Sequence, residues 1–316
     1  MRFARLRLVS AVAGLAVFVA AAVSACNGTE ITPPTIDGDL ALRYAQENYD
    51  LGPKVYRTEG AKKSAEWIVE QAKKTPGLEK AGGTVRIPPS SYGEYNVEIA
   101  FPGPSDDFVV VGAHHDTKLL FSTPEFAGAN DGASGVGALL AMAAATTEYA
   151  QRKSLPCGIR FVFFDGEEAL YQYTETDGLV GSRAYVDMLR QDGSMKRCRA
   201  MILLDMIGDK DLHIELAGNS TAGLAGLVLK EAEKLGHADK FSRGKTPMID
   251  DHYPFLQAGI PAVDLIDFNY GPENCYWHTG ADTMDKLSAE SIKCAADVAL
   301  RTVWRIAASG FKDQPK

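Results

Sequence analysis

Residues 108–118 read FVVVGAHHDTK, and the fold can be inferred outward from this stretch. Its first six residues form an apolar run of strand length without alternation, which is typical of a strand buried on both faces. A helical pattern follows at about 134–150, and a second apolar run lies at 159–164. Strands that alternate with helices predict an α/β domain built on a mostly parallel sheet.

The same alternation extends along the rest of the chain. We expect further helices at 40–48, 61–73, 181–190, 221–235 and 288–308, and further strands at 82–87, 95–101, 200–206, 212–216 and 262–266. Pro102, Gly103 and Pro104 predict a turn that would join strand 95–101 to strand 108–112 in a hairpin-like edge. Since no internal repeat or second linker interrupts the pattern, one domain from 38 to 316 is the simplest organisation.

The N-terminus has the pattern of an export signal. Three arginines precede an apolar run at 8–23, and residues 23–26 read VSAC, which resembles a bacterial lipobox whose cysteine is lipidated. We expect a lipoprotein signal peptide at 1–25 and a polar tether at 26–37. The protein would then be exported and held by its lipid anchor on the membrane, in the bacterial periplasm or at the cell surface. A plain signal peptide cleaved after Ala25, or an uncleaved anchor helix, is the alternative.

Charge and cysteine content restrict the partners and the compartment. The formal net charge is −8, and cleavage of the arginine-bearing signal would make the mature chain more acidic, which argues against nucleic acid as a partner. Export implies an oxidising compartment in which the remaining cysteines can pair. These are Cys157, Cys198, Cys275 and Cys294. Cys157 and Cys198 each precede an apolar run, so we expect them to pair across the starts of neighbouring parallel strands.

Ionisable residues follow the predicted central strands. They are His114 and Asp116 after the first, Asp165, Glu167 and Glu168 after the second, Asp205 after the third, with Asp131 before a crossover helix and His278 after strand 262–266. Each alone also fits an ordinary role as a helix cap, a solvated strand end or a core histidine. Those roles do not explain the coincidence at one sheet edge, where open α/β proteins bind their ligands. A cation would relieve the repulsion among the carboxylates, and a mixture of imidazole and carboxylate oxygens suits zinc.

Six motifs in this chain resemble those of one family. GAHHDTK, GANDGASG, FFDGEEA, LLDMIG, DDHYPFL and YWHT lie in this order within a resemblance that runs from about 108 to 305. Together they resemble the metallopeptidase family that contains bacterial zinc aminopeptidases and the animal-type glutaminyl-peptide cyclotransferases. The resemblance implies a three-layer α/β/α fold with a twisted, mostly parallel mixed sheet. It also implies an enzyme with one or two zinc ions that acts on peptide or protein N-termini.

The resemblance assigns a role to each candidate residue. One zinc would be held by Asp131, Glu168 and His278, and in the aminopeptidase branch a second zinc, bridged by Asp131, would be held by His114 and Asp205. Glu167 would act as the general acid and base, because the side chains of adjacent residues diverge and only Glu168 faces the metal. Asp116 would orient His114. Asp205 and Asp250 would complete the catalytic group, and Trp277, Tyr173 and Asp264 would line the substrate pocket.

Two chemistries fit these residues. A cyclotransferase lets the α-amine of an N-terminal Gln attack its own γ-carbonyl and expel ammonia, whereas an aminopeptidase lets water attack the first peptide bond. Segment 171–183, Asp250 and Trp277 resemble the cyclase branch, which we therefore favour. Asp264 and Tyr173 depart from it, because the cyclase pattern has His and Trp there, and Asp264 could instead hold a free α-ammonium. An inactive binding domain on the same fold is a third possibility.

Overall fold

The computed structural model describes residues 32–309 and residue 311, and the segment from Pro33 onward forms one unit. Its sheet has eight strands among these residues, in the order β1-β2-β4-β3-β5-β8-β6-β7. The strands are β1 (Thr84–Arg86), β2 (Val97–Phe101), β3 (Phe108–His114), β4 (Gly158–Phe164), β5 (Cys198–Asp205), β6 (Ile214–Leu216), β7 (Phe241–Arg243) and β8 (Ala262–Ile266). The four central strands β4, β3, β5 and β8 run parallel, while β2 and β6 are antiparallel to their central neighbours. The predicted mixed, mostly parallel sheet is therefore confirmed.

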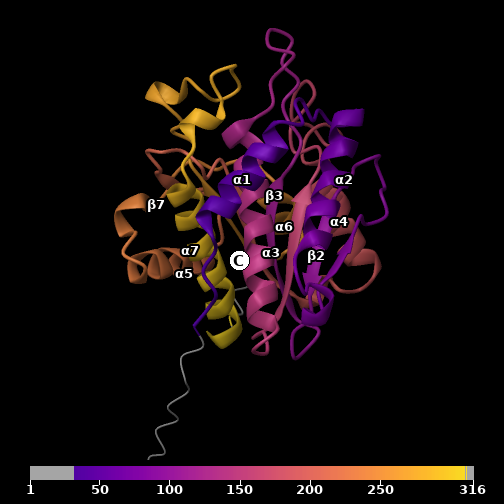
Figure 1. Ribbon diagram of the computed structural model, residues 1–316, viewed down its shortest axis with the longest axis vertical. Coiled ribbons are helices and arrows are strands. Elements are labelled where there is room, and N and C mark those ends of the chain that lie inside the picture. Colours follow the sequence, from indigo (N-terminus) through magenta and orange to yellow (C-terminus); the bar gives the residue numbers. More distant parts are fainter. Residues whose placement is uncertain (1–31, 310, 312–316) are drawn as a thin grey trace, which may run out of the picture. The chain divides into compact units, whose positions relative to one another are not determined.

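Helices cover both faces of the sheet. They are α1 (Gly38–Tyr49), α2 (Glu59–Lys74), α3 (Gly135–Ala150), α4 (Val180–Gln191), α5 (Ala222–Lys234), α6 (His252–Gln257) and α7 (Ala289–Ser309). Figure 1 shows α7, α3 and α2 on one face, and the larger apolar cluster joins these helices, α1 and α5 to the sheet. The smaller apolar cluster joins α4 and α6 to the other face. This is the predicted three-layer α/β/α fold.

Alternation along β3 shows why the sheet needs cover on both faces. Val109 and Val111 belong to the first cluster, while Phe108 and Val110 belong to the second. All seven residues of β3 are buried. An unbroken apolar run therefore becomes a central strand, as the sequence predicted.

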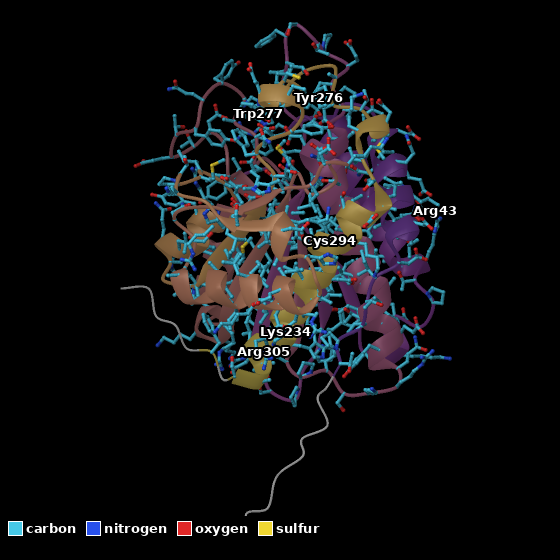
Figure 2. The ribbon with its side chains drawn as sticks, turned by 90° about the vertical axis from the view of Figure 1, so that its left-hand side faces the viewer. Arg43, Lys234, Tyr276, Trp277, Cys294 and Arg305 are labelled. Atoms are coloured by element: carbon cyan, nitrogen blue, oxygen red, sulfur yellow. The ribbon has the colours of Figure 1, made fainter. Side chains whose placement is uncertain are left out.

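The carboxyl ends of the parallel strands lie at the same edge of the sheet. β3 ends at His114, β4 leads into residues 165–168, and β5 ends at Asp205. Figure 2 shows Tyr276 and Trp277 at one end of the domain, with Lys234 and Arg305 towards the other. The loops that follow these strand ends carry the predicted chemistry.

Two predictions about strand neighbours were wrong. β2 pairs with β4 and not with β3, so the turn at Pro102–Pro104 leads the chain past β4 instead of closing a hairpin. β3 also lies between β4 and β5, which separates Cys157 from Cys198 by two strand spacings of about 4.8 Å each. That separation exceeds the reach of a disulfide, and both thiols are free and buried.

The predictions for the N-terminus fall mostly outside the described residues. The signal segment at 1–25, the lipidated Cys26 and the tether as far as residue 31 are among the residues left out. Within the part that the structure describes, no helix combines the length and apolar character needed to span a bilayer.

Gly137 marks the closest approach of α1 to α3 and provides a test of this packing. A Cβ atom at Gly137 would lie 2.3 Å from the carbonyl oxygen of Ala41, whereas one at Gly226 in α5 would have open space. We therefore expect Gly137→Ala to lower the free energy of unfolding by about 1 to 3 kcal/mol, because the helices must move apart. Gly226→Ala should raise it by about 0.5 to 1 kcal/mol, because alanine is the better helix former. Urea denaturation of both variants measures the two effects, and equal changes would contradict the packing.

Candidate metal centre and active site

The three residues predicted to hold a zinc ion lie together. The Nε2 atom of His278 is 2.9 Å from Oε1 of Glu168 and 3.1 Å from Oδ2 of Asp131. One donor atom from each of the three lies within 4.8 Å of the others. Segments more than 100 residues apart in the chain are thus joined at one point of the sheet edge.

A second group shares Asp131 with the first. The Nε2 atom of His114 is 3.2 Å from Oδ1 of Asp131 and 3.2 Å from Oδ1 of Asp205. The two oxygens of Asp131 therefore face different histidines, as expected for a residue between two metal positions. The same contacts also describe a hydrogen-bond network around a single metal.

Asp116 contacts both the His114 ring and the backbone of the two glutamates. Its carboxylate accepts hydrogen bonds from the backbone N–H groups of Glu167 (3.1 Å) and Glu168 (3.2 Å). Its backbone oxygen lies 3.2 Å from Nδ1 of His114, and its Oδ1 lies 3.6 Å from the same nitrogen. Asp116 thus positions both the His114 ring and the pair of glutamates.

Glycines give the loop that carries Asp131 its shape. Asp131 has φ −82° and ψ 86°, which breaks the helical course of residues 129–134, and Gly132 has φ 106°. Gly128 has φ 58°, and a Cβ there would lie 2.0 Å from the carbonyl oxygen of Asp131. Only glycine fits at these two positions, so the GANDGASG pattern is a requirement of the local geometry.

The donor set suits a divalent transition metal such as zinc. Oδ2 of Asp131 and Oε2 of Glu168 are buried, and neither accepts a hydrogen bond from any residue that the structure describes. Ion pairs with His278 and with Lys118, at 3.1 and 3.3 Å, are their nearest compensation. Carboxylate oxygens and imidazole nitrogens both bind zinc, and a set of three protein ligands leaves a coordination position open, as in catalytic zinc sites.

In a site without metal, the histidines carry the compensating charge. Burial lowers the pKa of His278, but the neighbouring Asp131 and Glu168 outweigh burial and raise that pKa to about 10. Burial is likewise outweighed at His114, whose pKa is raised well above its usual value by Asp116, Asp131 and Asp205. A metal ion that binds either imidazole must therefore displace the proton from that imidazole.

Glu167 lies beside the ligand group and faces Tyr173. The hydroxyl group of Tyr173 donates to the Glu167 carboxylate, with oxygen distances of 3.0 and 3.3 Å. Burial and the charge of Glu168 raise the pKa of Glu167 well above its usual value. A carboxyl group with a raised pKa, held by one hydroxyl, can take up and return a proton near neutral pH.

The other predicted site residues fall into two environments. Trp277 stacks on His278 with 3.9 Å between ring centroids, and Tyr173 is 39% exposed, so both can contact a ligand. Asp264 in β8 is fully buried next to Asp250, and with His252 these two carboxylates form a third group of possible metal donors. Burial raises the pKa values of Asp250 and Asp264, so uncharged carboxyl groups that share protons fit this third group better than a cation does.

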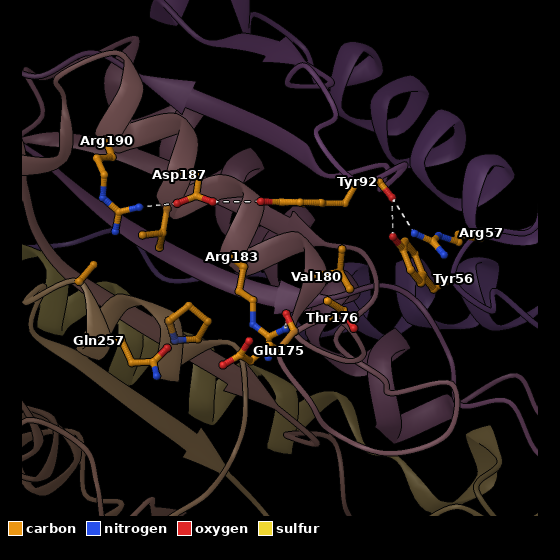
Figure 3. Close-up of a pocket in the computed structure, with 13 residues that line it drawn as sticks. Tyr56, Arg57, Tyr92, Glu175, Thr176, Val180, Arg183, Asp187, Arg190 and Gln257 are labelled. Atoms are coloured by element: carbon orange, nitrogen blue, oxygen red, sulfur yellow. Dashed lines mark hydrogen bonds and ion pairs between the residues drawn. The ribbon is translucent and has the colours of Figure 1, made fainter.

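A separate pocket of about 560 Å³ is lined by residues of α4 and by Glu175 and Thr176, in the segment that follows Tyr173 (Figure 3). Arg183 of α4 donates to the backbone oxygens of Thr174 and Glu175 and so fixes this segment. None of the predicted site residues belongs to the described lining of the pocket.

Sequence reasoning missed two buried residues that contact the Asp131 loop. Asp282 accepts hydrogen bonds from the backbone of Asn130 and Asp131, and Lys54 donates to the backbone oxygen of Ala127. The only sequence signal for Asp282 is its place four residues after His278. Lys54 has no such signal, because lysine is ordinarily exposed.

Comparison with known proteins finds one peptidase family and several solved structures that resemble this chain. The profile of peptidase family M28 matches residues 96–303. A glutaminyl cyclase from an Acidobacteriales bacterium superposes with a TM-score of 0.77 at 31% identity, covering 89% of this chain and 98% of that one. A Zn-dependent exopeptidase from Parabacteroides distasonis superposes with a TM-score of 0.68 at 25% identity, over 86% of this chain and 99% of that one.

One sequence relative is a peptidase. Aminopeptidase YwaD of Bacillus subtilis is 32% identical over 208 residues, which cover 63% of this chain and 41% of that protein. The chain therefore spans less than half the length of this relative.

The raised pKa of His278 predicts how stability depends on pH in the absence of metal. The unfolded histidine titrates near 6.5 and the folded one at about 10, so its protonation stabilises the folded state fully below pH 6.5 and no longer does so above pH 10. Against a His278→Gln variant, both stripped by a chelator, the wild-type advantage in melting temperature should shrink between pH 6.5 and pH 10. An advantage that stays constant over this range would contradict the assignment.

Proposed function

Because this chain belongs to peptidase family M28, we propose that it is a zinc-dependent glutaminyl-peptide cyclotransferase that converts N-terminal Gln into pyroglutamate and releases ammonia. Its relatives, which include glutaminyl cyclases and aminopeptidases, make it an enzyme of this family. The observation that carries the finer proposal is the match to a glutaminyl cyclase over 98% of that chain. Its substrates would be the N-termini of peptides or proteins.

Asp131, Glu168 and His278 would hold the zinc ion. Bound there, zinc would act as a Lewis acid towards the γ-carbonyl oxygen of the substrate. The contacts of His278 with both carboxylates support this ligand set. His114 and Asp205 would then keep hydrogen-bonding roles around Asp131.

Glu167 would carry the proton in the reaction. The α-amine nitrogen forms a bond to the γ-carbon while Glu167 accepts a proton from that amine. The same proton then passes to the departing nitrogen, the carbon–nitrogen bond of the amide breaks, and ammonia leaves. The attack is intramolecular, so the main tasks of the protein are to orient the Gln side chain and to place the base.

Burial of the acid group at β8 supports cyclisation over hydrolysis. An aminopeptidase needs an anionic group to hold the α-ammonium of its substrate, and Asp264 was the candidate for that role. Asp264 is fully buried, and burial raises its pKa, so it fits poorly as an accessible carboxylate. As uncharged acids, Asp264 and Asp250 can donate and accept hydrogen bonds within their own group, and the charge of Glu167 acts on Asp250. Trp277 would form the pocket wall beside the metal.

Aminopeptidase activity is the alternative, and one observation favours it. His114, Asp131 and Asp205 form a complete second group of metal donors, as a two-zinc peptidase requires. The relationship to aminopeptidase YwaD points the same way. In either case, we propose that the enzyme works outside the cytoplasm on a lipid anchor at Cys26.

The division of roles between the two glutamates can be tested by substitution. Glu167→Gln keeps an acceptor for the Tyr173 hydroxyl but removes the proton carrier, so turnover should fall about 10²- to 10⁴-fold. Its zinc content should stay at the wild-type value, whereas His278→Ala should lose zinc and activity together. Metal analysis and steady-state kinetics measure both, and loss of zinc from Glu167→Gln would mean that the two glutamates have been exchanged.

The reaction itself can be identified from its products. The purified zinc-loaded protein is given one peptide that begins with Gln and one that begins with Leu, and the products are weighed by mass spectrometry. We expect the first peptide to lose the mass of ammonia and the second to stay intact. Release of a free amino acid, together with two zinc ions per chain, would contradict the cyclase and support the aminopeptidase. If neither peptide changes, the remaining hypothesis is an inactive binding domain.

A further inference from the structure

The loop that carries Asp131 lacks a regular helical backbone that would fix its shape. Gly128, Asp131 and Gly132 leave the helical course, and two of them have positive φ. Glycine gains the most freedom when a loop opens, so the shape of such a loop must be fixed from outside. Two buried charged side chains do so, from opposite ends of the chain.

Lys54 contacts the loop from the N-terminal side. Its Nζ atom donates to the backbone oxygens of Ala127 (2.7 Å) and Gly52 (3.2 Å). Its backbone N–H donates to Oγ1 of Thr117 at 2.8 Å, and the N–H of Thr117 donates back to the Lys54 oxygen at 3.3 Å. Lys54 thus ties the loop to the segment that follows His114.

The burial of Lys54 needs an explanation. Its side chain is fully buried, which is rare for lysine unless the charge is compensated. Burial lowers its pKa to about 7, while the carboxylates of Asp282, Asp116 and Asp131 act in the opposite direction. Those carboxylates surround the metal centre, so the lysine lies where negative charge is concentrated.

Asp282 contacts the loop from the C-terminal side. Its carboxylate accepts hydrogen bonds from the N–H groups of Asn130 (2.8 Å) and Asp131 (3.2 Å) and from the hydroxyl of Tyr270 (2.7 Å). The N–H of Asp282 donates to the oxygen of Thr279, directly after His278. Asp282 therefore connects the backbone of the proposed ligand Asp131 to the loop that carries the proposed ligand His278.

We propose that Lys54 and Asp282 are positioning residues that clamp the Asp131 loop in its metal-binding shape. The inference rests on the proposed metal centre and names residues that do not touch the metal themselves. Replacing a residue that hydrogen-bonds to a metal ligand typically lowers metal affinity by about 10- to 100-fold. Here the clamp acts on the backbone of the ligand loop, so its loss lets Asp131 leave the position that faces His114 and His278.

Two variants test the clamp without large changes of volume. Lys54→Met keeps most of the buried stem but removes both hydrogen bonds from Nζ. Asp282→Asn presents an amide with one oxygen to three donors, so at least one backbone N–H of the loop loses its acceptor. Zinc affinity of each purified variant, measured by competition with a chromophoric chelator, should fall about 10- to 100-fold. Lys54→Arg, which can still donate to a carbonyl, should recover part of the loss.

Lys293 and Asp297 in α7 supply matched controls. Lys293 donates to the oxygen of Ile36 and to Asp297, and Asp297 accepts the N–H of Ile36, so this pair also fixes a loop to the fold. Neither residue contacts the metal centre. Lys293→Met and Asp297→Asn should lower the melting temperature and leave zinc affinity within about twofold of wild type.

The outcomes separate the clamp from the proposed function. Weaker zinc binding in both clamp variants, with melting temperatures of the chelated forms no lower than those of the controls, supports the clamp. Zinc affinity that matches wild type, or that falls equally in clamp and control variants, overturns it. Wild-type protein that binds no zinc would instead refute the metal centre. Should Lys54→Met fail to fold, Asp282→Asn and its matched control Asp297→Asn carry the test.

Discussion

Buried negative charge at the carboxyl ends of the central strands is the constraint that organises this protein. Asp131 and Glu168 are buried there, and the side chain of Asp205 is 12% exposed. Isolated buried carboxylates are costly, and each needs a proton, a hydrogen-bond donor or a cation. His114 and His278 supply protons to these carboxylates, and a divalent ion can replace those protons. Backbone N–H groups satisfy the neighbouring carboxylates of Asp116 and Asp282.

The same constraint explains which features the sequence could predict. Long apolar runs such as 108–113 identify central strands because both faces are buried, and the residues that follow them must then meet at one edge. That argument places the ionisable residues together at one edge, and the family resemblance then singles out Asp131, Glu168 and His278 among them. Strand order was beyond its reach, because β2 pairs with β4 through contacts between segments more than 50 residues apart. The proposed Cys157–Cys198 bridge was wrong for this reason.

Positioning residues were also hard to predict, because lysine and aspartate usually have other roles in a protein. A lysine such as Lys54 is expected at the surface, and an aspartate such as Asp282 reads as a turn or a cap. Only the folded structure shows that both lie against the Asp131 loop. Sequence patterns identify candidate catalytic and metal-binding residues more readily than they identify positioning residues. The role of a positioning residue depends on contacts with segments that are distant in the sequence.

Backbone strain shows how firmly the site is held before a substrate arrives. His278 has φ 52°, and Met206, the residue after Asp205, has φ 49°, both in a region that costs a non-glycine residue about 1 kcal/mol or more. Asn130 stabilises the second of these turns, since its side chain donates to the oxygen of Met206 and accepts the N–H of Gly208. The backbone N–H of Asn130 donates to Asp282, in the loop that follows His278. The residue next to Asp131 therefore joins the three loops that carry the proposed metal donors Asp131, Asp205 and His278. A strained conformation persists only where the surroundings fix it more than once, so this geometry is preorganised for its ligand.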